Sequence, residues 1–481
     1  AWESKNAKNA AKAGGVSLMA LSLAACGGSS TPVAVAPADP VAPVAPVVPT
    51  TVAMSTAGDE VTALTSAQNI TAILSDDSTK TTLNAGDEVT GVDGSGSTIT
   101  ITDSSGADIT ASETPDVRGV DNVVINFDSL AVNGTAQVEV AVTDFAKANA
   151  YSFDVVNTSS VVKDIVLTGT LDGATVTTSA DFSAVKITPA AAGNDVVAVV
   201  NNTDAALVVV NVAGNVTATG AGDLNVTSST TTGLVDLTAA GDLTATAAAA
   251  LTFKANATAG DLTVTSSAAA LLVDVEATGD VTLTDATAAT DINVVSGGDV
   301  SITKAAAGDI NVSAAGTITT AGTTAMLATS ATLSGAGTSS IDMNAATTLN
   351  LSGNGAAATF NMVSGEHAAL AAVNVSGSQN VTLGVEASEI AGALKVTDSG
   401  TGTFKLNVGG STGAVDVSGG LIDDLNVNLD LAASTLTVAS TQAVDFTVDQ
   451  GTSSSLVVGS AAAAATNSVT LNLNDGNTAS G

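Results

Sequence analysis

Apolar and polar residues alternate one by one along much of this chain, and from residue 222 onward the alternation recurs at a fixed interval. A Gly-Asp pair opens each unit, and the pairs lie 19 residues apart at four successive steps. Every second position after a pair is apolar, led by Leu224, Leu243, Leu262, Val281 and Val300, and Thr, Ser or Asn fill the positions between. This period of two with one apolar face predicts a half-buried strand.

A second apolar stretch follows about twelve residues after each glycine, near residues 234–237, 253, 272–275, 292–294 and 310–312. Each 19-residue unit therefore predicts two strands and two turns. Units of this size bury a shared core only by stacking, which is typical of a solenoid. Toward the C-terminus the spacing widens to about 21, as two series of strand starts indicate: Leu394, Val415 and Leu436, and Phe404 and Leu425.

We predict an all-β fold, a parallel β-helix-like β-solenoid with about 19–21 residues per coil, preceded by a small acidic β-rich domain. A series of small β-sandwiches is the alternative, because it also places strands every 8 to 12 residues. The expected boundaries are a signal peptide at 1–26, a Pro-rich linker at 27–55, the acidic domain at 56–115 and the solenoid at 116–481. The acidic domain contains the string GDEVT twice, from Gly58 and from Gly86.

The N-terminus indicates export. Lys5, Lys8 and Lys12 precede a short apolar run, the layout of a secretory signal peptide. The run ends Leu23-Ala24-Ala25-Cys26-Gly27, which resembles the bacterial lipobox, and the resemblance implies that Cys26 is lipidated. The next residues carry six prolines at near-regular spacing, which favours an extended polyproline II stalk between the membrane anchor and the rest of the chain.

Composition excludes several kinds of site. Lys and Arg number 12 against 46 Asp and Glu, a net charge of −34, so phosphate backbones would be repelled and we expect no nucleic-acid partner. Cys26 and His367 are the only residues of their kinds, too few for a Cys/His zinc site. Ser364-Gly365-Glu366-His367 is the one place where Ser, Glu and His meet, and it lacks an orienting third group, so we expect no enzyme.

The Gly-Asp pairs supply the candidate metal ligands. In a solenoid they would stack at one corner, and like charges one strand spacing apart repel by roughly 1 kcal/mol in water and 3 kcal/mol nearer the protein. Ca²⁺ accepts carboxylate oxygens in flexible geometry and would relieve this repulsion. The simpler interpretation is that each Asp caps its own turn by bonding local backbone. The five candidate ligands are Asp223, Asp242, Asp261, Asp280 and Asp299.

The outward residues of the same strands form Thr-x-Thr rows that resemble the ice-binding faces of some antifreeze proteins. Thr is also the ordinary choice for the solvent face of a strand, so ice binding is a minor alternative.

The region 116–481, rich in Ala, Thr, Val, Gly, Asn and Asp with strings such as TLTVAS (435–440) and VTLNLND (469–475), resembles the structural region of bacterial surface-layer proteins related to RTX proteins. The resemblance implies a calcium-bridged lattice outside the outer membrane. We therefore expect a non-enzymatic cell-surface structural protein, lipid-anchored at Cys26, stabilised by Ca²⁺ and self-assembling into an S-layer-like array or filament. The main alternative is an adhesin or fibre that binds host or environmental glycans.

Overall fold

The computed structural model describes residues 50–474, and the strands in it belong to one compact unit, Pro49–Gly481. Gaps in the description fall at 65–66, 76, 85, 106–107, 110–115, 129–136, 143–144, 147, 156–163, 170–173, 180–181, 183, 189–195, 201–204, 211–213, 229–232, 248, 288, 304–307, 322–328, 344–345, 364–369, 410–413, 421, 430–433, 439–442, 450–455 and 461–467.

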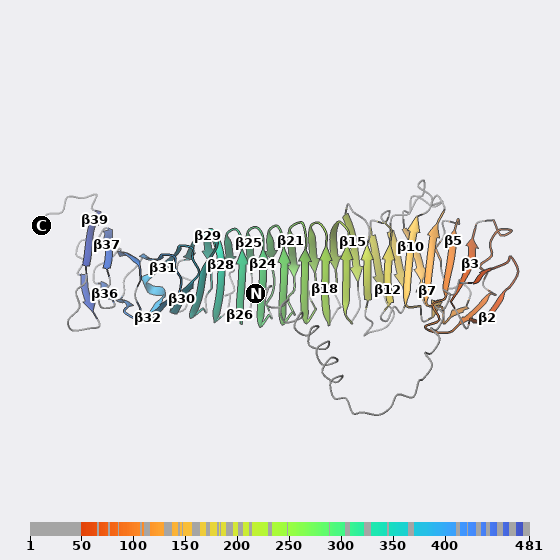
Figure 1. The fold of residues 1–481 in the computed structure, drawn as a ribbon, viewed down its shortest axis with the longest axis horizontal. Coiled ribbons are helices and arrows are strands. Elements are labelled where there is room, and N and C mark those ends of the chain that lie inside the picture. The colour runs from red at the N-terminus through yellow and green to blue at the C-terminus, as the bar shows by residue number, and fades with distance from the viewer. Residues whose placement is uncertain are drawn as a thin grey trace, which may run out of the picture. The chain divides into compact units, whose positions relative to one another are not determined.

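Strands from successive coils pair in parallel to form two long ladders, and the strand pairings of the described residues are parallel throughout. Most coils place one strand in each ladder, so a strand generally pairs with the strand of the next coil and not with its neighbour in sequence. The exceptions are two long strands, residues 330–341 and 348–362, which span both ladders and pair with each other and with their sequence neighbours. Figure 1 shows the two ladders as two layers of arrows across the stack. This arrangement is a β-solenoid, and the predicted fold class is confirmed.

The first ladder begins at the N-terminal end of the unit and takes in the following strands: β1 (Thr50–Ala53), β3 (Gln68–Leu74), β5 (Thr98–Asp103), β7 (Asn122–Phe127), β10 (Ala150–Val155), β12 (Ala174–Thr178), β14 (Val196–Val200), β16 (Val216–Gly220), β18 (Leu234–Ala239), β20 (Thr252–Ala257), β22 (Leu272–Ala277), β24 (Asp291–Ser296), β26 (Asp309–Ala314), β28 (Ser330–Ile341), β29 (Thr348–Met362), β30 (Leu370–Ser376), β32 (Ile390–Asp398), β34 (Ala414–Val417), β36 (Ser434–Val438) and β38 (Leu456–Ser460).

The second ladder also includes the C-terminal halves of the long strands β28 and β29, and its other strands are as follows: β8 (Gln137–Ala141), β11 (Asp164–Thr168), β13 (Ala184–Thr188), β15 (Ala205–Val210), β17 (Asp223–Thr227), β19 (Leu243–Thr246), β21 (Leu262–Ser266), β23 (Val281–Leu283), β25 (Val300–Thr303), β27 (Ile318–Ala321), β31 (Val381–Glu386), β33 (Phe404–Gly409), β35 (Asp424–Leu429), β37 (Ala443–Asp449) and β39 (Ser468–Asn474). A one-turn 3-10 helix, η3 (Ala387–Glu389), follows β31.

The core is a file of aliphatic residues in register. Leu224 pairs with Leu243, Leu243 with Leu262, and Leu262 with Val281, and each of these side chains is at most 2% exposed. Each therefore contributes close to its full burial energy, about 1.5–3 kcal/mol. The predicted stacking of the 19-residue units, with two strands per unit, is confirmed.

The coil period near the C-terminus follows the prediction at one of three steps and departs from it by two residues at the other two. Ala393 is paired with Asp416, which places Leu394 opposite Val417 rather than opposite its predicted partner Val415. Val415 is paired with Leu436 as the 21-residue spacing predicts. The predicted alignment of Phe404 with Leu425 is wrong, because Leu425 lies opposite Leu406. A slip of two residues leaves every side chain on its original face, so the apolar pattern alone does not distinguish the two registers.

The stretch expected as a separate acidic domain is built into the same sheet. β5 pairs with β7 across the expected boundary near residue 115, with Ile99 opposite Val123 and Ile101 opposite Ile125. The two GDEVT strings form β2 (Glu60–Leu64) and β4 (Glu88–Gly91), which pair in parallel. With β6 (Asp116–Arg118) and β9 (Phe145–Ala146) they make a short third ladder that gives the first coils an additional side.

Aromatic side chains fill the N-terminal coils. Phe127, Phe145, Phe153 and Phe182 are buried there, and the rings of Phe127 and Phe182 meet edge to face with centroids 6.0 Å apart. The single tyrosine, Tyr151, is buried among the same coils and donates its hydroxyl to the carbonyl of Phe145 at 3.2 Å. These coils are longer than the 19-residue ones, so a larger core volume has to be filled.

Candidate functional site

The Asp residues of the Gly-Asp pairs form a continuous ladder that links one coil to the next. At the first four steps the backbone N–H of one Asp donates to Oδ1 of the Asp in the preceding coil, and at the fifth the N–H of Thr317 is the donor. The successive bonds are Asp242 to Asp223 (2.8 Å), Asp261 to Asp242 (2.8 Å), Asp280 to Asp261 (2.7 Å), Asp299 to Asp280 (2.7 Å) and Thr317 to Asp299 (2.6 Å). We call this set the Asp ladder.

A second bond closes each step of the Asp ladder in the opposite direction. The N–H of Leu243 donates to the carbonyl oxygen of Asp261 in the next coil at 2.8 Å, and Leu262 donates to Asp280 in the same way. The corner thus satisfies backbone donors that strand pairing leaves free at the ends of strands, which would otherwise need water.

The glycine before each Asp makes room for this arrangement. A Cβ on Gly241, Gly260, Gly279 or Gly298 would lie closer than 3.0 Å to Oδ1 of the Asp in the preceding coil, which real Cβ atoms essentially never do. The two residues of the Gly-Asp dipeptide therefore act together. The Gly leaves space for the carboxylate of the preceding coil, and the Asp carboxylate accepts a hydrogen bond from the following coil.

The Asp ladder corrects one expectation. Capping of each Asp's own turn was the simpler alternative to calcium binding, and the carboxylates instead cap the next coil. The five Asp side chains are exposed. With Oδ1 already engaged, each coil offers one remaining carboxylate oxygen at this corner, whereas Ca²⁺ takes about 6–8 oxygen ligands. In the described part of the chain no three His, Cys, Asp or Glu side chains gather closely enough to hold a metal ion, and calcium binding here stays a prediction.

The same corner design occurs at a position that sequence reasoning missed. Asn215 accepts the N–H of Leu234 at 2.8 Å through Oδ1, and a Cβ on Gly233 would clash with that oxygen. Asn215 and Leu234 are 19 residues apart, so the repeat spacing itself was the available signal. Asn lacks the charge of Asp and still supplies the acceptor, which shows that the acceptor is the common requirement.

Asp121 is a buried carboxylate in the N-terminal coils, 6% exposed. Burial by itself would raise its pKa, but the backbone N–H groups of Gly94, Gly96 and Ser97 donate to the carboxylate, and the net effect is a pKa below the ordinary value of 3.8. The bond from Gly94 is 2.7 Å long, and Asn149 from the next coil donates its Nδ2 at 3.1 Å. Asp121 therefore ties together three segments of chain, and its role is structural.

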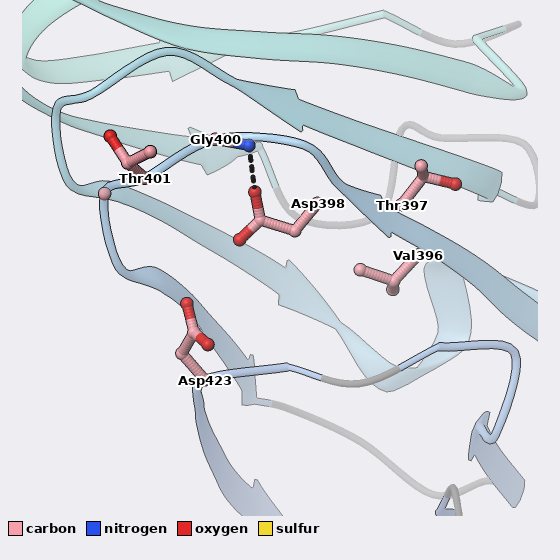
Figure 2. Close-up of a pocket in the computed structure, with 7 residues that line it drawn as sticks. Val396, Thr397, Asp398, Gly400, Thr401 and Asp423 are labelled. Carbon is pink, nitrogen blue, oxygen red and sulfur yellow. Dashed lines mark hydrogen bonds between the residues drawn. The ribbon is translucent and has the colours of Figure 1, made fainter.

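An open hollow of about 650 Å³ lies at the C-terminal end of β32, and it is lined by Val396, Thr397, Asp398, Gly400, Thr401, Gly402 and Asp423. Both carboxylates border the hollow (Figure 2). Each is bound to backbone: Asp398 accepts the N–H of Gly400 and Asp423 that of Phe404, both at 2.8 Å. The lining is mainly polar and carries two carboxylates.

The outward positions in the middle of β17 and of the strands stacked on it carry no charge. We call this surface the neutral face, and it consists of Asn225, Thr227, Thr244, Thr246, Thr263, Thr265, Thr282, Thr284, Ser301, Thr303, Thr319, Ala321, Thr338, Ser340, Thr359, Asn361, Thr382 and Gly384. The Thr-x-Thr rows predicted from the sequence thus stack over successive coils, with one register shift between β19 and β21, where Thr246 is paired with Ser266. The hydroxyls of Thr246 and Thr265 share a hydrogen bond.

Cys26, the predicted lipidation site, and the Ser364–His367 segment lie outside the described residues. Within the described part, no helix is both long and apolar enough to cross a membrane.

Comparison of the chain with family models, with curated proteins and with solved structures gives no match in any of the three.

Proposed function

We propose that this chain is a non-enzymatic structural protein of the bacterial cell surface, anchored by lipid at Cys26, whose solenoid assembles into an array or filament. The observation that carries the proposal is the Asp ladder, which braces consecutive coils with paired hydrogen bonds while leaving the outward faces free. A stack braced in this way resists bending and shear between coils. Mechanical continuity is what a surface scaffold needs.

Calcium enters the proposal through assembly rather than through the fold. Copies that each carry a net charge of −34 repel one another, and multivalent cations screen or bridge such charge more effectively than monovalent ones. We expect Ca²⁺ to act between copies, at exposed carboxylates, with the parallel sheet of each copy stable in its absence.

The anchor and the spacer complete the proposal. A lipidated Cys26 holds the chain at the outer membrane, and the part of the Pro-rich segment that precedes β1 spaces the solenoid from the lipid surface. The expected linker 27–55 is too long at its C-terminal end, because Thr50–Ala53 already pair with β3 in the first ladder. In this arrangement the solenoid faces the exterior. A Cys26→Ser variant should then be lost from the envelope fraction into the medium.

Electron microscopy of intact envelopes tests the proposal. A periodic layer or filament that disperses when EGTA is added and re-forms when Ca²⁺ is restored is the expected result, with circular dichroism unchanged throughout. Isolated projections without periodicity would contradict assembly and favour the adhesin alternative. An EGTA-insensitive layer would contradict the calcium contribution and leave the structural role in place.

A further inference from the structure

We infer that the neutral face is the lateral contact between two copies of this chain, and that the two copies lie side by side and point in the same direction. This inference rests on the proposed function, since it names the surface through which the assembly forms.

Charge distinguishes the neutral face from the opposite layer of the solenoid over the coils from β17 to β26. The opposite layer of the same coils, formed by the outward positions of β18, β20, β22, β24 and β26, carries Asp236, Lys254, Asp274, Glu276, Asp291 and Asp309. In a chain with a net charge of −34, two copies meet with least Coulomb repulsion through a surface that has no charge. The neutral face is such a surface, and it is continuous from β17 to β31.

The neutral face is large enough to hold two copies together. It spans nine strands, from β17 to β31. At about 4.8 Å per coil and about 15 Å of strand it covers about 650 Å². A pair of copies would bury about 1,300 Å² in total, within the range of specific protein interfaces. Small Thr, Ser and Asn side chains on a regular pleat allow close approach over the whole area.

The Asp ladder determines the relative direction of the copies. It runs along one edge of the neutral face, where its exposed carboxylates begin each strand from β17 to β25. A two-fold axis along the strands would lay the two Asp ladders against each other. A two-fold axis along the solenoid places them on opposite edges of the contact and keeps both solenoids pointing the same way. Lower repulsion selects the second arrangement, which is also the one that two chains anchored in the same membrane adopt.

Charge insertion tests the choice of face. Thr263→Asp places a carboxylate in the middle of the neutral face, and a two-fold contact brings it close to its own copy. Thr238→Asp is the matched control, since Thr238 is equally half-buried and outward on the opposite layer, in β18. By sedimentation of the full chain, we expect Thr263→Asp to weaken dimerisation by roughly tenfold or more and Thr238→Asp to change it less than about twofold. Equal effects of the two variants would overturn the assignment, and unchanged circular dichroism shows that both fold.

Single cysteines test the direction, in a Cys26→Ser background that removes the one native thiol. Asn225→Cys and Thr382→Cys lie at opposite ends of the neutral face, eight coil spacings or roughly 40 Å apart. Copies that point the same way bring each cysteine to its own counterpart, so a short bismaleimide, which adds one thiol at each end, should cross-link both variants as homodimers. Antiparallel copies would cross-link only mixtures of the two variants, which would overturn the inference.

The remaining outcomes separate this inference from the proposed function. A lattice that persists in Thr263→Asp, with no cross-linking at either cysteine, overturns the neutral face as the contact but leaves assembly standing. A wild-type protein that stays monomeric and shows thermal hysteresis would overturn both the neutral-face contact and the proposed assembly. The neutral face would then be an ice-binding surface.

Discussion

Oδ1 of Asp261 accepts the backbone N–H of Asp280, one coil further along the stack, at 2.7 Å. Both residues are exposed, and side chains at such positions ordinarily contribute little to stability. Here the carboxylate completes the hydrogen bonding of the neighbouring coil, and the same bond recurs at each step of the Asp ladder. The recurrence of Asp every 19 residues is therefore explained by hydrogen bonds between coils, without a bound ligand.

Substitution of Asp261 separates the acceptor from the charge. Asp261→Asn keeps an Oδ1 acceptor for Asp280 and removes one of a stack of like charges, so we expect its melting temperature to equal or exceed that of the wild type. Asp261→Ala leaves the N–H of Asp280 without its acceptor, and we expect a loss of about 1 kcal/mol. Thermal unfolding followed by circular dichroism measures both. A fall in stability with Asn as large as that with Ala, seen only when Ca²⁺ is present, would show instead that the carboxylate is a metal ligand.

Substitution of the glycine in a Gly-Asp pair should destabilise the fold. Gly260→Ala forces a Cβ against Oδ1 of Asp242 and the backbone beside it, so we expect a loss of about 1–3 kcal/mol from overpacking. Gly86→Ala is the control, because the same dipeptide at Gly86 has no atom within 4 Å of the added Cβ, and its stability should stay within about 0.5 kcal/mol of the wild type. Urea titration compares the two. Equal tolerance at both sites would contradict the packing of the Asp ladder.

Asp121 predicts a stability difference that depends on pH. Its folded pKa is lowered, so the ionised side chain stabilises the fold above the unfolded value, and this contribution is lost as pH falls through the folded pKa. Asp121→Asn keeps one acceptor and adds a donor beside the N–H groups of Gly94 and Gly96, for a loss of about 1–3 kcal/mol at neutral pH. The gap between the melting temperatures of wild type and variant should narrow below pH 3.8. A gap that stays constant in acid would assign the loss to packing alone.

Tyr151 reports on the N-terminal coils at alkaline pH. Burial raises its pKa above the ordinary 10.0, so the neutral phenol is favoured in the folded state. The resulting stabilisation is complete below pH 10.0 and is lost as pH rises toward the folded pKa. Because the chain has one tyrosine, its phenolate absorbance can be followed without interference. We expect ionisation to begin above pH 10 and to coincide with loss of the β-sheet signal, whereas titration at the ordinary pKa in a folded protein would contradict its burial.

The stacking of units was readable from the sequence because a period of 19 repeats both the glycine corner and the strand alternation. Leu243, Leu262 and Val281 were expected in one file and are register partners. The predicted strand register was wrong where two registers are compatible with the same alternation of apolar and polar residues. Leu425 lies opposite Leu406, two residues from its predicted partner, because a shift of two preserves the buried face.

The expected division near residue 115 shows a second limit. Acidic composition and the GDEVT spacing of 28 residues separate this stretch from the 19-residue repeat, although Ile99 and Val123 join both parts in one sheet. Coil length varies along a solenoid without interrupting its strand pairing, because pairing depends on the strands and not on the length of the turns between them. A change of period therefore does not by itself mark a domain boundary.

The sequence by itself determined the class of fold, the two strands of each unit and the residues that line the core, since these follow from alternation and period, which are local properties. The tertiary structure decided where the aspartates direct their carboxylates. The 19-residue repeat is compatible with an Asp that caps its own turn and with an Asp that caps the next coil. The short distance between stacked coils, which the sequence does not give, allows the second arrangement. The structure likewise showed how far the neutral face extends along the solenoid, because that continuity depends on which strands pair.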